Sequence, residues 1–169
     1  IEMIEQAADA GANAVKFQSI LFNKLYQKEY ESKKFYDWFK SIELNEKWYP
    51  ILIKHAKKNN LEFLSSPTYS GAIDLFNQYN LKAIKIASPQ FQGDHEIVKK
   101  AALTGKPLIL STGYALEKEI KFNKDLCFKY KNRKLVFLHC VSKYPTAYKE
   151  TNLIFFNKLK QLTGCLVGF

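Results

Sequence analysis

Five short apolar segments that each end in polar residues constrain this chain most. One of them, residues 82–90, reads KAIKIASPQ: its apolar run contains Lys85 and ends in Ser88 and Gln90. This is the pattern of a buried parallel strand that delivers polar groups at its C-terminal end. The same pattern recurs in residues 14–18, 63–67, 108–113 and 136–140. Because parallel strands end at one edge of a sheet, we predict that the five ends form one polar rim.

Lys85 is the residue of this pattern that most needs an explanation. An ammonium group inside a strand is costly to bury unless it meets an anion. Lys85 therefore either lies at an exposed strand edge or faces a phosphate or carboxylate group. The recurrence of the pattern along the chain favours the second interpretation.

Helical patterns separate most of the strands, in the order that βα units demand. The expected helices cover residues 1–10, 45–59, 70–79, 94–104, 116–130 and 151–162, and the sixth strand is the apolar run 165–169. An open doubly wound sheet and part of a (β/α)₈ barrel both fit this order. Polar residues follow nearly every strand and do not gather at one switch point, which favours the barrel.

The chain is short for a closed barrel, which needs eight strands and typically about 250 residues. Here 169 residues hold six expected strands, with a helix before the first of them. We therefore predict a truncated (β/α)₈ TIM barrel, in which residues 1–169 are a partial catalytic domain with about strands 2 to 7. An unclosed barrel exposes two strand edges, so we expect the isolated chain to aggregate or to be marginally stable.

The segment 19–44 is too long for a plain connection between a strand and a helix. It is expected to form a lid over a site or to contain helical turns of its own. Its aromatic side chains suggest that it packs against other residues; they include Phe35, Tyr36, Trp38 and Phe39.

Charge and cysteine content restrict the partners and the compartment. The net charge of +10 comes mainly from lysines spread along the chain, which solvated helix faces explain better than a nucleic-acid surface. Cys127, Cys140 and Cys165 show no paired spacing, so neither a disulfide framework nor a zinc cluster is indicated. No apolar run approaches the roughly 20 residues that span a bilayer, and the first residues show no secretory signal. We predict a cytoplasmic protein without nucleic-acid or membrane partners.

Five motifs make the chain resemble the sialic acid synthase family, which includes N-acetylneuraminate, legionaminate and pseudaminate synthases. In order, the motifs are AGANAVKFQ, FLSSP, KAIKIAS, LTGKPLILSTG and FLHCVSKYPTAY, and the match runs from Ile1 to Phe169. The resemblance implies an N-terminal (β/α)₈ barrel followed by an antifreeze-like domain. By this comparison the first strand, the last strand and the antifreeze-like domain are absent. The complete protein is expected to be a homodimer.

The resemblance also implies a reaction. Members condense phosphoenolpyruvate with an N-acylated amino sugar, here N-acetylmannosamine or a related sugar, to a nine-carbon 2-keto acid, and they release phosphate. Such acids enter lipopolysaccharide, capsule or flagellar glycans. The reaction needs a divalent metal, Mn²⁺ or Mg²⁺, whose ligands are expected outside this chain, so no residue here is assigned to the metal. The chain alone is expected to be inactive.

The site residues expected here also come from the resemblance. Phosphoenolpyruvate carries a phosphate and a carboxylate, so its site needs lysines and short hydroxyl donors. Lys16 and Lys85 match the lysines of the family, and Lys85 and Gln90 are expected to be catalytic. The remaining expected contacts are Ser66, Ser88, Ser111 and Ser142 for phosphoenolpyruvate, and Gln18 and Tyr144 for the amino sugar.

One departure from the family pattern lies at Pro89-Gln90, where the family usually has Gly-Glu. That glutamate is thought to take part at the reacting carbon, and a glutamine can donate and accept hydrogen bonds but cannot exchange protons. We therefore expect reduced turnover. Two alternatives remain open: a phosphoenolpyruvate-dependent keto-deoxy sugar-phosphate synthase, and a catalytically degenerate barrel that binds sugar or phosphate.

The histidines and Cys140 have structural interpretations as well. His139 and Cys140 are adjacent in an expected strand, so their side chains point to opposite faces and cannot both enter one site. We expect Cys140 to be a packing residue and His55 to be a packed core histidine on its helix. His95 is expected in a loop, where contact with substrate is the less favoured of its two interpretations.

Overall fold

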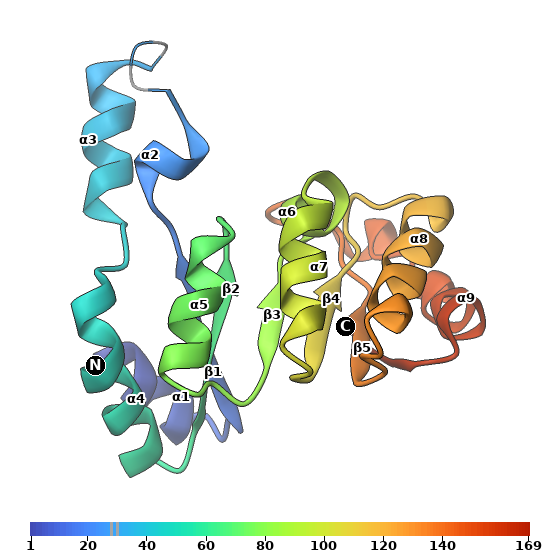
Figure 1. Cartoon of the computed structure of the whole chain (residues 1–169), viewed down its shortest axis with the longest axis horizontal. Helices are drawn as coiled ribbons and strands as arrows, with labels where there is room; N and C mark the ends of the chain where they lie inside the picture. Colours follow the sequence, from blue (N-terminus) through green and yellow to red (C-terminus); the bar gives the residue numbers. More distant parts are fainter. Residues whose placement is uncertain (28, 30) are drawn as a thin grey trace. The chain divides into compact units, whose positions relative to one another are not determined.

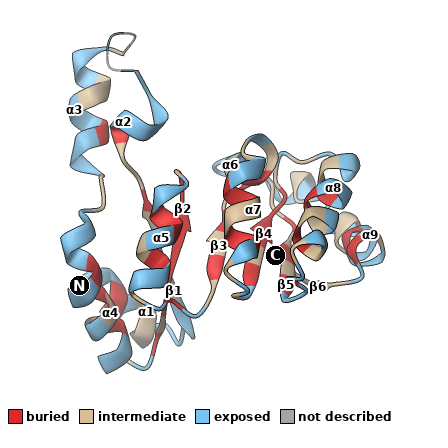
Figure 2. Cartoon of the chain, in the orientation of Figure 1, coloured by how far each residue is buried: buried red, intermediate tan, exposed pale blue. Residues whose placement is uncertain are grey.

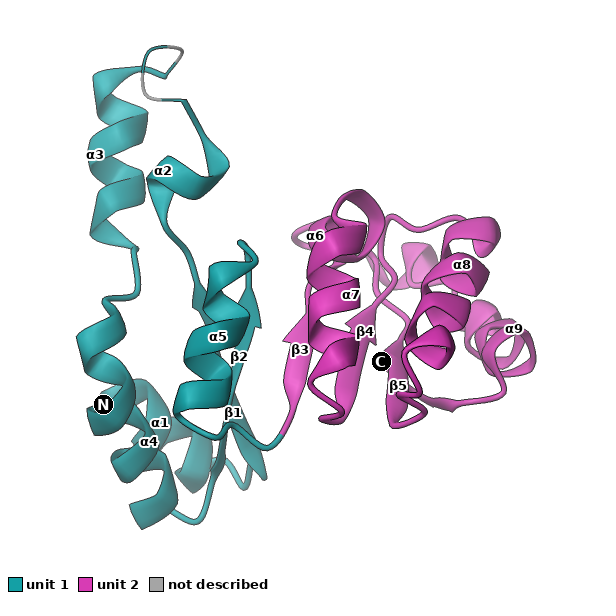
Figure 3. Cartoon of the chain, in the orientation of Figure 1, with its two compact units in different colours: residues 1–82 teal, residues 83–169 magenta. Residues whose placement is uncertain are grey.

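The computed structural model describes residues 1–27, 29 and 31–169, in which helices alternate with six parallel strands (Figure 1). The strand order β1-β2-β3-β4-β5-β6 follows the sequence. These residues form two compact units, Ile1–Lys82 (unit 1) and Ala83–Phe169 (unit 2), which are coloured separately in Figure 3. The α/β class with a parallel six-stranded sheet is confirmed, whereas truncation of a barrel stays a prediction.

Unit 1 is built on strands β1 (Ala14–Ser19) and β2 (Glu62–Pro67). They are parallel, with Ala14 opposite Glu62 and Ser19 opposite Pro67. Helices α1, α4 and α5 pack on these strands. Their bounds are Glu2–Asp9 for α1, Tyr49–Lys58 for α4 and Gly71–Gln78 for α5.

Tyr49 anchors the core of unit 1. Its ring stacks on Tyr79 with centroids 5.7 Å apart and meets Phe63 edge to face at the same separation. Its hydroxyl is hydrogen-bonded to the Ser65 hydroxyl at 2.8 Å and to that of Ser19. Burial raises the pKa of Tyr49, so the phenol stays neutral and its polar atom is satisfied inside the core. The 3₁₀ turn η2 (Glu46–Trp48) precedes α4, whose first turn contains Pro50, at a position where the missing N–H costs no hydrogen bond within the helix.

The segment 19–44 contains helices α2 (Phe22–Leu25) and α3 (Lys33–Ser41), which confirms the expectation of helical turns. Phe22 is fully buried and meets Phe39 edge to face at 5.5 Å between centroids. Glu43 accepts a hydrogen bond from the backbone N–H of Phe22 at 2.6 Å, which links the end of the segment to the start of α2. The expected packing of its aromatic residues is therefore confirmed in part, since Trp38 is exposed. A lid function stays a prediction.

Unit 2 contains four parallel strands, in the order β3-β4-β5-β6, and four helices. The strands are β3 (Ile84–Ile86), β4 (Leu108–Ser111), β5 (Leu135–Leu138) and β6 (Leu166–Gly168), and the helices are α6 (Ser88–Gly93), α7 (His95–Leu103), α8 (Glu117–Lys129) and α9 (Ile154–Thr163). Each helix packs on the next one in sequence. Figure 2 shows the buried residues concentrated in the strands and on the inner faces of these helices.

Several local expectations were wrong. The segment 82–90 is not one strand, because β3 ends at Ile86 and Ser88 already begins α6. His95 is the first residue of α7 and not a loop residue. The helix expected over residues 151–162 begins only at Ile154. The helix expected over residues 94–104 is confirmed as α7, and the Asp94 carboxylate caps it by accepting from the Ile97 N–H at 3.0 Å.

None of the helices in the described residues combines the length and the apolar character that a bilayer-spanning helix needs.

Candidate anion-binding site

Lys85 lies at the centre of the candidate site in unit 2. Its neighbours Ile84 and Ile86 are fully buried on one face of β3, so strand alternation places the Lys85 side chain on the opposite face. There the Lys85 ammonium donates a hydrogen bond to the Ser111 hydroxyl, with Nζ and Oγ 2.8 Å apart. The structure therefore brings together the ends of β3 and β4, as the rim prediction required.

Gly113 brings two further hydroxyl groups close together. Its backbone N–H donates to Ser88 Oγ at 3.0 Å. A Cβ atom added at Gly113 would lie 2.3 Å from Ser142 Oγ and 2.9 Å from Ser88 Oγ, so the backbone approaches both serines more closely than any side chain would allow. The Tyr114 hydroxyl also donates to the Ser142 carbonyl at 3.4 Å. The segments that follow β3, β4 and β5 thus converge at Gly113.

The electrostatics of Lys85 point to an anionic ligand. Burial lowers the pKa of Lys85 from its ordinary value, and the neighbouring Cys140 thiol partly opposes that shift. Among residues 1–27, 29 and 31–169, no carboxylate forms an ion pair with Lys85. A half-buried ammonium that lacks a counter-charge is costly, and a bound anion would remove that cost. The site therefore offers one cation, several hydroxyl groups and a backbone N–H to an anion.

Unit 1 carries three other expected site residues, on β1 and β2. Gln18 lies opposite Ser66 in the strand register, and Lys16 shares the face of Gln18 two residues earlier. Ser66 is fully buried, and its hydroxyl has no hydrogen-bond partner within the part of the chain that the structure describes. A buried hydroxyl without a partner is unusual and marks a place where a ligand or water would supply the missing hydrogen bond.

Gln90 and Tyr144 differ in how far their side chains are buried. Gln90 lies in the first turn of α6, and its side-chain carbonyl oxygen is buried without a hydrogen-bond partner among the described residues. Tyr144 is 95% exposed, in the segment that follows Ser142. The structure therefore groups Lys85, Ser111, Ser88 and Ser142 but does not pack Tyr144 against them.

His139 and Cys140 follow β5, which ends at Leu138, so the strand alternation on which their expected separation rested does not extend to them. His139 Nε2 donates to the Thr151 carbonyl at 2.7 Å, and the ring packs on Phe155 with centroids 5.5 Å apart. Cys140 borders Gly113, and both Cys140 and His139 line one cavity of about 260 Å³, so the expectation that they cannot enter one site was wrong. Cys140 is therefore a neighbour of the candidate site, and its expected packing role stays a prediction.

The other two histidines make polar contacts. His55 is not a fully packed core residue, because its side chain is 18% exposed, and its Nε2 pairs with the Glu5 carboxylate at 2.9 Å. His95 Nδ1 is hydrogen-bonded to the Asn123 side chain at 3.1 Å.

Sequence reasoning overlooked Asn123 and the close approach at Gly113. The adjacent Ser-Thr-Gly of the fourth motif was the one available signal for Gly113.

The metal that the family resemblance implies does not fit this part of the chain. Among the described residues, no group of three or more His, Cys, Asp or Glu side chains is placed to hold a metal ion. We therefore assign no metal ligand here and derive no chemical step through a metal.

Known proteins match this chain over almost its full length. The family model described as the NeuB family matches residues 3–169. The N,N′-diacetyllegionaminic acid synthase of Campylobacter jejuni is 35% identical, over 99% of this chain and 54% of that protein. The pseudaminic acid synthase of Helicobacter pylori is 30% identical, over 99% of this chain and 52% of that protein.

A solved structure supports the same relationship. The crystal structure of N-acetylneuraminic acid synthetase from Leptospira borgpetersenii, in complex with citrate, superposes with a TM-score of 0.88 at 30% identity. The match covers 99% of this chain and 57% of that one. The chain thus spans about half the length of the curated relatives it matches. The resemblance that the five motifs predicted is confirmed, and the chain belongs to the NeuB family.

Proposed function

We propose that this chain is the part of a synthase that binds phosphoenolpyruvate and joins it to an N-acylated amino sugar, with release of phosphate. The observation that carries the proposal is the half-buried Lys85 ammonium, which is bonded to Ser111 and lacks a carboxylate partner among the described residues. Ser88, Ser142 and the Gly113 N–H add short donors that suit phosphate or carboxylate oxygens. The names of the relatives support the sialic-acid type of reaction.

In this proposal the residues of unit 2 neutralise the charge of phosphoenolpyruvate. The Lys85 ammonium and the serine hydroxyls would donate to its anionic oxygens, which stabilises the charge that grows on the departing phosphate. For Lys16 and Ser66 of unit 1 the same role rests on family membership and on the unpartnered Ser66 hydroxyl. Gln18 and Tyr144 are proposed to contact the amino sugar, for which an exposed tyrosine offers an aromatic face.

The cellular setting follows from the proposed substrates. Phosphoenolpyruvate is an intracellular metabolite, so we propose a cytoplasmic enzyme, with a homodimer as the state of the complete protein. A divalent metal, Mn²⁺ or Mg²⁺, would be bound by ligands outside residues 1–169.

The test of the proposed function is phosphate release by the full-length protein that contains this sequence. Phosphoenolpyruvate, Mn²⁺ and a panel of N-acylated amino sugars are supplied, with phosphorylated sugars as a separate arm. Release that needs the metal and one N-acylated sugar would support the proposal and identify the acceptor. Release with a phosphorylated sugar alone would replace it by a keto-deoxy sugar-phosphate synthase.

Gln90 favours a second candidate, a barrel that binds phosphoenolpyruvate without turning it over. An amide at this position can accept a hydrogen bond but cannot exchange a proton. Tight binding of phosphoenolpyruvate together with no phosphate release for any sugar in the panel would support this candidate.

We predict that Gln90→Glu raises phosphate release by at least about tenfold, because a positioned general acid or base typically contributes more than that. The measurement is the rate of phosphate release at saturating substrates. Gln92→Glu makes the same chemical change two residues later on α6 and serves as the matched control. An unchanged rate for Gln90→Glu would show that the amide does not limit turnover.

A further inference from the structure

Helix α6 carries Ser88 and Gln90 but spans only six residues, Ser88–Gly93. A helix this short has little stability of its own, and the carbonyls of its last turn lack partners within the helix. Its position must therefore be fixed by contacts from other elements. Phe91 supplies one of them, since its fully buried ring meets Phe137 edge to face at 6.2 Å between centroids.

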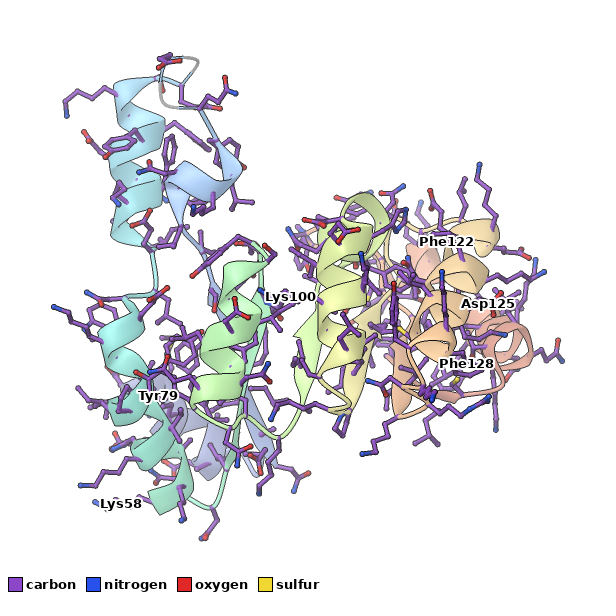
Figure 4. The ribbon with its side chains drawn as sticks, viewed as in Figure 1. Lys58, Tyr79, Lys100, Phe122, Asp125 and Phe128 are labelled. Carbon is purple, nitrogen blue, oxygen red and sulfur yellow. The ribbon has the colours of Figure 1, made fainter. Side chains whose placement is uncertain are left out.

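Asn123 supplies the second contact. It lies on α8 and is fully buried, and its side-chain N–H donates to the Phe91 carbonyl with Nδ2 and O 2.8 Å apart. Because Nδ2 is the donor, Oδ1 is the acceptor, and it meets His95 Nδ1 at 3.1 Å. The His95 ring packs on Phe122, labelled on α8 in Figure 4, with centroids 4.7 Å apart. One amide thus links α8 to the last turn of α6 and to the first residue of α7.

We propose that Asn123 is a positioning residue for the anion site: it fixes α6 and thereby holds Ser88 and Gln90 toward the ligand. Ser88 Oγ is already held at 3.0 Å from the Gly113 N–H, so a small shift of α6 would disturb that contact. Without Asn123 the buried Phe91 carbonyl loses its donor, and α6 must move to regain one from water. This inference rests on the proposed function, in which Ser88 and Gln90 contact phosphoenolpyruvate.

The test compares Asn123→Ala with Cys127→Ala in the full-length protein. Cys127 lies one turn later on α8 and is also fully buried, so its truncation weakens the same packing without freeing the Phe91 carbonyl. Phosphoenolpyruvate binding is measured by titration calorimetry, and amide hydrogen exchange is measured over residues 88–94. We expect Asn123→Ala to weaken phosphoenolpyruvate binding about tenfold, as loss of a buried hydrogen bond implies. We expect Cys127→Ala to change it less than about twofold.

Hydrogen exchange keeps the test independent of the proposed function. Faster exchange over residues 88–94 in Asn123→Ala, but not in Cys127→Ala, supports the inference even if the wild-type protein binds no phosphoenolpyruvate. Absence of phosphoenolpyruvate binding by the wild type would refute the proposed function alone. Equal exchange and equal binding changes in the two variants would overturn the inference. Should Asn123→Ala not fold, Asn123→Asp replaces it, because the carboxylate keeps the volume but has no N–H to donate to the Phe91 carbonyl.

Discussion

Lys85→Met should weaken phosphoenolpyruvate binding by at least about 100-fold, because loss of one partner from a buried charge pair typically costs several kcal/mol. Methionine retains most of the length and volume of the lysine side chain but removes the ammonium that donates to Ser111. The measurement is the dissociation constant for phosphoenolpyruvate, obtained by titration calorimetry at neutral pH. Lys121→Met makes the same change at an exposed position of α8 and should leave binding unchanged.

Lys85→Met should not lower the free energy of unfolding, in contrast to its effect on phosphoenolpyruvate binding. Burial lowers the pKa of Lys85 below its unfolded value, so the folded state disfavours the ammonium form. This penalty is full at pH values below the folded pKa and disappears as the pH rises toward the ordinary lysine value of 10.5. At neutral pH, Lys85→Met removes the penalty, and we expect the ligand-free variant to be as stable as the wild type or more stable.

The pH dependence of binding gives a second check on Lys85. Anion binding needs the ammonium form, so affinity for phosphoenolpyruvate should fall as the pH rises through the lowered pKa of Lys85. The fall should therefore begin at a lower pH than it would for an exposed lysine. Unchanged binding in Lys85→Met at neutral pH would remove Lys85 from the site, whatever the stability result.

The sequence predicted those parts of the site that depend on strand alternation. Ile84 and Ile86 are apolar and Lys85 is charged, so one pattern of period two indicated both the buried face and the polar one. Short-range patterns were less reliable where two of them competed. Ser88-Pro89 follows a strand pattern and is also a helix-start signal, and α6 begins at Ser88, so Gln90 lies in the first turn of a helix.

Long-range contacts could not be predicted from the sequence. Asn123 lies in a charged helix whose sequence contains nothing to show that this amide reaches the Phe91 carbonyl 32 residues away. The hydrogen bond between the Tyr49 and Ser65 hydroxyls depends in the same way on how α4 packs against β2. Such contacts are set by the packing of elements, and the periodicity of a single segment carries no information about them.

Gly113→Ala is the second change with a large expected effect. The added Cβ would lie 2.3 Å from Ser142 Oγ, 2.9 Å from Ser88 Oγ and 3.3 Å from Cys140 Cβ, so the two hydroxyls must rotate away or the segments that hold them must move. Overpacking of this kind typically costs about 1–3 kcal/mol of folding free energy. The same displacement separates the donors of the anion site, and we expect phosphoenolpyruvate binding to weaken by about 10- to 100-fold.

Two further variants separate the steric effect from the loss of flexibility that any glycine-to-alanine change brings. At Gly93 an added Cβ meets nothing within 4 Å, so Gly93→Ala should leave both stability and binding near wild-type values. Adding Ser142→Ala to Gly113→Ala removes the closest clash. The double variant should regain part of the lost stability in thermal unfolding, but not the binding, because the Ser142 donor is gone. If Gly113→Ala bound phosphoenolpyruvate as tightly as the wild type, convergence of the three strand ends at Gly113 would have no role in binding this ligand.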